Sequence, residues 1–80
     1  MRDKDIADHI EALVKEEHEL LERAETTPLG DVDRERFEEI NVRLDQYWDL
    51  LRQRRARRDA GQDPGVAHIR AEEIVEHYKQ

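Results

Sequence analysis

Apolar side chains recur at spacings of three, four and seven from residue 3 to residue 25, and most positions between them are charged. This is the spacing of a single stripe along an amphipathic α-helix. The pattern therefore predicts a helix over about residues 3–25. Its stripe consists of Ile6, Ile10, Leu13, Val14, Leu20, Leu21 and Ala24.

A segment around Pro28 interrupts this helix, because proline disfavours helical backbone at the residue before it. Asp33 is a typical N-cap, and Val32 and Phe37 stand at the two positions of a hydrophobic staple. These signals predict a second helix over about residues 34–59.

The second helix has an apolar stripe of the same period, and Gly61 supplies the residue type preferred just after a helix end. The stripe consists of Phe37, Ile40, Leu44, Tyr47, Trp48 and Leu51. A last short helix is expected over about residues 71–79, with Ile74, Val75 and Tyr78 as its apolar side.

Two long helices joined by a short connection are expected to form an antiparallel hairpin. Aligning the two stripes places Ala24 opposite Phe37 and Ile10 near Leu51. In this register the acidic start of the first helix lies beside the arginine-rich end of the second. The acidic residues concerned are Asp3, Asp5 and Asp8.

The fold class predicted for residues 1–80 is a single all-α domain, an antiparallel two-helix hairpin plus a short C-terminal helix. The two stripes are wider than a two-stranded seam, so a hairpin alone leaves apolar surface exposed. We therefore expect two hairpins to dimerise into a four-helix bundle. The sequence leaves open whether the C-terminal helix folds back on its own hairpin or clasps the second subunit.

Composition narrows the possible functions. Of the 80 residues 44% are charged, and the net charge is −7, which makes general binding to DNA or anionic membranes unfavourable. No apolar run approaches the roughly 20 residues of a membrane span, and the charged beginning does not resemble a secretory signal. We expect a cytoplasmic protein.

The usual catalytic motifs are missing from the sequence. The chain has no cysteine and no serine, which removes the commonest nucleophiles and the thiolate metal ligands. It has no glycine-rich phosphate loop and no nucleotide-binding fingerprint. We therefore expect no enzymatic activity, no catalytic residues and no cofactor.

Five of the fourteen basic residues gather at the end of the second helix; they are Arg52, Arg54, Arg55, Arg57 and Arg58. Such a patch fits phosphates, but around a helix these side chains point in several directions. Cations also stabilise a helix C-terminus. We favour an ionic end paired with the acids of the first helix, and contact with nucleic acid or with an unidentified protein partner is the alternative. Arg52 and Arg57 point away from the predicted contact.

The stripe of the second helix is the candidate interface, formed by Phe37, Ile40, Leu44, Tyr47, Trp48 and Leu51. Aromatic side chains are enriched in interfaces, and on a helical stripe they also commonly belong to a core. Both interpretations place Trp48 between helices or between subunits.

A metal-dependent enzyme is a further hypothesis, built on Glu17, His9 and His18. Glu17 is the one polar residue in the middle of the first stripe. We favour instead a polar residue that sets the register by pairing with Tyr47 or an arginine. No glutamate stands three residues before a histidine, as di-metal bundles require, so we expect no metal site.

Several runs resemble a family of short helical proteins found mainly in actinobacteria, the domain-of-unknown-function family 2630. The runs are Leu44–Arg58 with the following Ala60–Pro64, Ile10–Leu20, and Val75-Glu76-His77-Tyr78. The family carries prolines before its last helix, where this chain has Arg70-Ala71. The resemblance implies a bacterial, intracellular, stand-alone helical protein, and it brings no catalytic residues.

These observations favour a non-enzymatic helical interaction or structural module that forms a homodimer through its apolar stripe. The alternative is a small regulator that binds nucleic acid or the transcription machinery through Arg52–Arg58.

Overall fold

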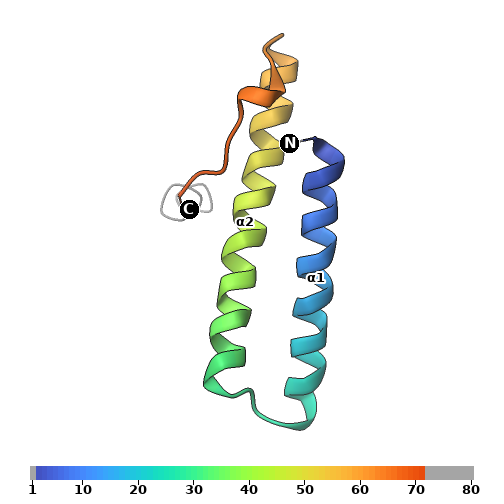
Figure 1. The fold of residues 1–80 in the computed structure, drawn as a ribbon, viewed down its shortest axis with the longest axis vertical. Coiled ribbons are helices and arrows are strands. Elements are labelled where there is room, and N and C mark those ends of the chain that lie inside the picture. Colours follow the sequence, from blue (N-terminus) through green and yellow to red (C-terminus); the bar gives the residue numbers. More distant parts are fainter. Residues whose placement is uncertain (1, 72–80) are drawn as a thin grey trace.

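The computed structural model describes residues 2–71. It has two long helices, α1 (Asp3–Thr26) and α2 (Asp31–Asp59), and one turn of 3₁₀-helix, η1 (Pro64–Val66). The two helices lie side by side and antiparallel (Figure 1), and residues 2–71 contain no strand. The all-helical class and the two-helix hairpin are thus confirmed. The predicted helix over about 71–79 lies, apart from Ala71, outside the described residues, and the four-helix bundle stays a prediction.

α1 begins at its acidic first turn, as the charge pattern indicates. The Asp5 carboxylate accepts a hydrogen bond from the Arg2 backbone N–H at 3.1 Å, which satisfies one of the donors left free at a helix N-terminus. Ile6, Ile10 and Leu20 from the predicted stripe are buried, whereas Leu21 remains 45% exposed. Neither helix has an apolar stretch sufficient to cross a membrane.

α2 begins three residues earlier than the sequence predicts. Its N-cap is Gly30 rather than Asp33, and Val32 is 79% exposed, so the predicted hydrophobic staple is wrong. Asp31 and Asp33 both fall in the first turn of α2, where their charges favour the positive end of the helix dipole. This extends the helix back to the glycine.

The earlier start of α2 also changes how the helices face each other. The predicted register placed Ile10 near Leu51, but the neighbouring His9 stacks on Tyr47, with ring centroids 5.2 Å apart and planes 4° from parallel. At the other end Arg23 pairs with Asp33 at 3.4 Å. Both contacts are offset from the prediction by about one helical turn, because the connection between the helices is shorter than expected.

The core lies along the seam between the helices. Leu50, which the stripe leaves on the flank of α2, is only 3% exposed. Leu50 lies one helical turn from both Gln46 and Gln53, whose side chains bind the backbone of the chain after α2. That part of the chain therefore covers this side of α2 as well. The buried apolar residues are Ile6, Ile10, Leu20, Ile40, Leu44 and Leu50.

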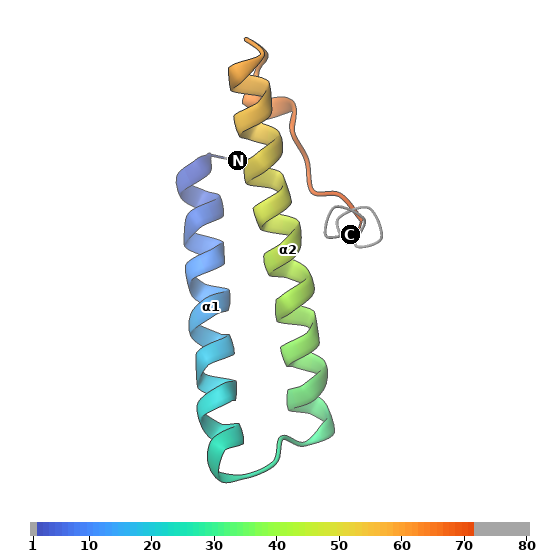
Figure 2. The same ribbon diagram turned by 180° about the vertical axis from the view of Figure 1, so that it is seen from behind.

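The chain reverses direction after α2. Gly61 adopts φ 73°, and the N–H groups of Gly61 and Gln62 bond the carbonyls of Arg58 (3.0 Å) and Arg57 (2.7 Å). This is the Schellman arrangement, which favours glycine because the left-handed backbone disfavours other residues. After η1, residues 67–70, here called the return segment, run back along α2 on the side away from α1 (Figures 1 and 2).

The molecule measures 50 × 26 × 17 Å along its principal axes. A helix with its side chains is about 10–12 Å across, so the shortest dimension corresponds to a single layer of helices.

Ile40 is 0% exposed at the centre of the seam. We expect Ile40→Ala to lower the free energy of unfolding by about 2–4 kcal/mol, through lost apolar burial and a cavity that only partly closes. Val32→Ala is the matched control in the same helix, and its effect is expected to stay within about 0.5 kcal/mol. Urea unfolding followed by circular dichroism measures both, and equal losses in the two variants would contradict this core.

Candidate functional site

The arginine cluster divides into two groups, and the first is structural. The Asp3 carboxylate accepts hydrogen bonds from Arg54 (Nε to Oδ1, 2.5 Å) and from Arg58. Arg54, whose side chain is only 12% exposed, also donates to the Pro64 carbonyl at 3.2 Å. These bonds fasten the beginning of α1 to the end of α2 and to η1. Of the three acids predicted to lie at this end, Asp3 pairs with the arginines, whereas Asp5 accepts from the Arg2 backbone N–H.

The second group faces solvent. Arg52 and Arg55 are exposed and line a shallow depression of about 220 Å³ together with Trp48 and Leu51. Arg57, which the sequence pointed to alongside Arg52, donates to the Gln62 side chain at 3.3 Å. The arginines that border the depression are thus Arg52 and Arg55.

The candidate interface is also divided. Ile40 and Leu44 are buried in the seam, and Tyr47 is half-buried under its stacking partner His9. Phe37 and Leu51 are half-buried, and Trp48 is 48% exposed. One side of the stripe therefore packs against α1 within the hairpin, and Trp48 lies at the solvent-exposed edge of the stripe.

One flank of the hairpin is held by polar interactions between the helices. Arg36 donates two hydrogen bonds to the Glu16 carboxylate, from Nε at 2.5 Å and from Nη2 at 2.9 Å. His9, Glu16 and Arg23 are seven residues apart on α1 and all contact α2 on this flank. Glu16, rather than the central Glu17, makes the pairing with an arginine that we expected.

The opposite flank is apolar, and we call it the open flank. On α1 it carries Val14 and Leu21, which are seven residues apart. At 100° per residue, both lie on nearly the opposite side of the helix from Glu16. On α2 it carries Phe37, Trp48 and Leu51. Exposure of 45% for Leu21 and 48% for Trp48 means that nothing among residues 2–71 covers this flank fully.

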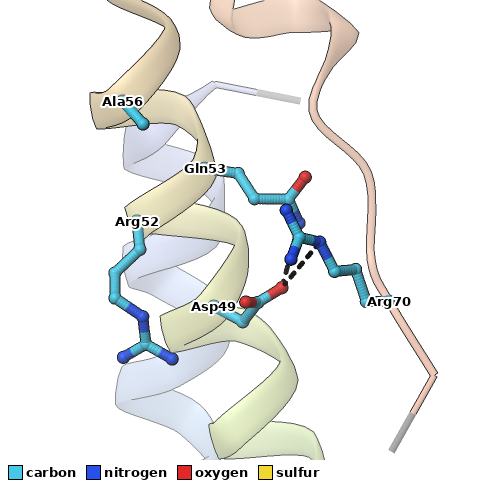
Figure 3. A pocket seen from close by; sticks show the side chains of 5 residues that line it. All are labelled: Asp49, Arg52, Gln53, Ala56 and Arg70. Carbon is cyan, nitrogen blue, oxygen red and sulfur yellow. Dashed lines mark hydrogen bonds and ion pairs between the residues drawn. The ribbon is translucent and has the colours of Figure 1, made fainter. Parts of the chain in front are cut away.

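A third polar cluster was not foreseen from the sequence. Asp49 and Gln53 are 2% and 8% exposed, although both are polar. Gln53 donates to the His68 carbonyl at 2.7 Å and Gln46 to the Arg70 carbonyl at 3.2 Å, while Arg70 pairs with Asp49 at 3.7 Å. Figure 3 shows Asp49 and Gln53 directed toward the return segment, and Arg52 directed away from it. The signal was a polar stripe at 46, 49 and 53, in the helical period.

The histidines and acids of residues 2–71 form no group of three or more that could hold a metal ion. His9 stacks on Tyr47, and His68 contributes its backbone carbonyl to Gln53. His77 lies outside the described residues. The hypothesis of a metal centre on Glu17, His9 and His18 therefore has no support in the geometry of these residues.

Two acids have lowered pKa values. The hydrogen bond from Arg54, reinforced by Arg58, holds the pKa of Asp3 below its ordinary value of 3.8, against the opposing effect of desolvation. The hydrogen bond from Arg36 likewise lowers the pKa of Glu16 from 4.5. The same contact raises the pKa of the Arg36 guanidinium.

Comparison with known proteins gives a family match over nearly the whole chain. A family described as "Protein of unknown function (DUF2630)" matches residues 2–80. Uncharacterised proteins of Mycobacterium bovis and of two Mycobacterium tuberculosis strains are each 39% identical over 77 residues, which is 95% of this chain and 88% of the relative. No solved structure matches the chain.

Because Asp3 and Glu16 are more acidic in the folded protein than in the unfolded chain, their pairing stabilises the fold above their ordinary pKa values. This stabilisation is lost as the pH falls through the lowered values. We expect the unfolding midpoint temperature to drop as the pH falls below about 4.5. The double variant Asp3→Asn/Glu16→Gln should start a few degrees lower at neutral pH and lose less on acidification.

Glu22→Gln, at an exposed site of α1, is the control and should retain the wild-type profile. Thermal unfolding at a series of pH values measures the midpoint temperature of the wild type and of both variants. Parallel profiles for the wild type and the double variant would show that these two pairs do not contribute to the pH dependence.

Proposed function

Since the chain belongs to the family DUF2630, whose function is unknown, we propose a role from its surface: a non-enzymatic helical module that self-associates through the open flank. The observation that carries the proposal is the exposure of Leu21 on α1 and of Trp48 on α2, in line with the half-buried Val14, Phe37 and Leu51 of the same flank. Isolated apolar residues on a surface are ordinary, but a row of them along two adjacent helices is typical of an interaction surface.

The single helical layer supports this proposal. Each helix buries the side that meets its neighbour, and residues 2–71 contain no further long helix that could cover the open flank. In the described part of the chain only six apolar residues are buried in the core. Domains of this size commonly gain stability from association with a further copy.

A second copy is the occupant best suited to this flank. It presents the same apolar row, so a two-fold arrangement buries equal surfaces from both chains. The other flank carries the Glu16–Arg36 pair and the His9 stack, which are already satisfied within one hairpin. Apolar residues of one open flank against those of another would produce the four-helix arrangement expected from the stripes.

We expect the wild-type protein to sediment as a dimer at tens of micromolar. Leu21→Lys places a charge on the open flank, where a dimer would bury it, and should yield a monomer with unchanged helix content. Ala12→Lys is the matched control, since residue 12 is exposed on the opposite side of the same helix. Sedimentation equilibrium and circular dichroism measure both properties.

A wild-type protein that stays monomeric across this range would refute self-association. Loss of the dimer in Ala12→Lys as well would move the interface away from the open flank.

Binding of nucleic acid is the second candidate, and the exposure of Arg52 and Arg55 beside Trp48 is the observation in its favour. Against it, Arg54 and Arg58 are engaged by Asp3, and the net charge is −7. The two arginines that are exposed here, Arg52 and Arg55, supply little of the counterion release on which such binding depends.

We therefore expect no saturable binding of labelled duplex DNA or single-stranded RNA in fluorescence anisotropy at low salt. Saturable binding that weakens with added salt, and that disappears in Arg52→Gln/Arg55→Gln, would instead favour the regulator.

A further inference from the structure

We propose that residues 72–80 of the chain dock on their own hairpin, in the depression formed by Trp48, Leu51, Arg52 and Arg55. This depression combines an apolar floor with two guanidinium groups at its margin. A ligand that fits it has apolar side chains on one face and carboxylates beside them.

The last described residues of the chain border a depression next to this place. Hydrogen bonds from Gln53 and Gln46 fix the backbone of the return segment on α2 as far as Arg70. Arg70 and Arg52 together line a second depression of about 210 Å³, with Asp49, Gln53 and Ala56 (Figure 3). Since Arg52 also borders the Trp48 depression, the two depressions adjoin at this residue.

The remaining chain is long enough to reach the Trp48 depression. Nine extended residues span up to about 30 Å. Since the two depressions adjoin at Arg52, the way round α2 is shorter than half the circumference of a helix, which is about 16–19 Å. The first four residues of the segment, up to about 14 Å when extended, bring Val75 to the Trp48 depression.

The composition of the segment complements the depression. Its apolar residues are spaced as on one side of a helix and would cover Trp48 and Leu51. Its acids stand next to them and would face Arg52 and Arg55. The apolar residues are Ile74, Val75 and Tyr78, and the acids are Glu72, Glu73 and Glu76.

Attachment to the same chain favours docking in cis. The return segment holds the chain beside α2 as far as Arg70, which gives the residues that follow a high effective concentration at the site. A second copy would have to compete with it. Docking covers the Trp48 end of the open flank and leaves Val14, Leu21 and Phe37 for the second copy, so the inference does not rest on self-association.

Trp48 is the only tryptophan, so its fluorescence reports directly on the depression. In the chain of 80 residues we expect Ile74→Asp/Val75→Asp to move the Trp48 emission to longer wavelength and to increase quenching by acrylamide. Gln80→Asp adds a charge at the end of the same segment and should leave both properties at the wild-type values. Circular dichroism verifies that α1 and α2 persist.

Arg55→Glu provides a second variant in case the first disturbs the fold, because Arg55 is exposed at the margin of the depression. It should cause the same change in emission by repelling the acids of the segment. Emission that is unchanged in both variants would overturn the proposal.

Protein concentration separates the two possible occupants. Docking in cis predicts wild-type emission that is constant while the sedimentation data pass from monomer to dimer. Emission that shifts together with dimer formation would assign the depression to the second copy and overturn docking in cis. A monomeric wild type in which Ile74→Asp/Val75→Asp still shifts the emission would support docking while refuting self-association.

Discussion

Two helices lying side by side can bury only the sides that face each other, and the rest of this structure depends on that constraint. The seam contains a short row of aliphatic residues, with Ile6 and Ile40 fully buried. Apolar burial is the main favourable contribution to folding, and a single seam provides little of it. The hairpin therefore relies on further contacts at its end, along one flank and on the far side of α2.

The polar contacts are placed where the seam cannot reach. Asp3 of α1 binds Arg54 and Arg58 at the end of the hairpin away from the connection, and Arg36 binds Glu16 along the flank opposite the open flank. On the far side of α2, the amides of Gln46 and Gln53 bond to backbone carbonyls, so they hold the return segment largely without regard to its side chains. These contacts give α2 neighbours on two sides, which makes it the central element of the chain.

This arrangement also accounts for the surface that remains. With α1 on one side of α2 and the return segment on another, the third side of α2 carries Trp48, Arg52 and Arg55. An indole and two guanidinium groups at one place suit an apolar partner that carries acids. The candidate site thus consists of the surface that the hairpin leaves uncovered. Arg54 and Arg58 hold the two helices together through Asp3, whereas Arg52 and Arg55 border this surface.

The sequence by itself determined the two helices, the break between them, the apolar stripes and the pairing of Asp3 with the arginine end, because these depend on local period and charge. Only the tertiary structure decided the register, the burial of Asp49 and Gln53, the exposure of Trp48 and the choice of Glu16 over Glu17. Each of these depends on a partner far away in the chain. A polar side chain is stable in the interior only where a distant group satisfies it, and a shift of about one turn between helices changes which residues meet. The polar stripe at 46, 49 and 53 marks one side of α2, but no periodicity within one helix identifies the distant group that meets it.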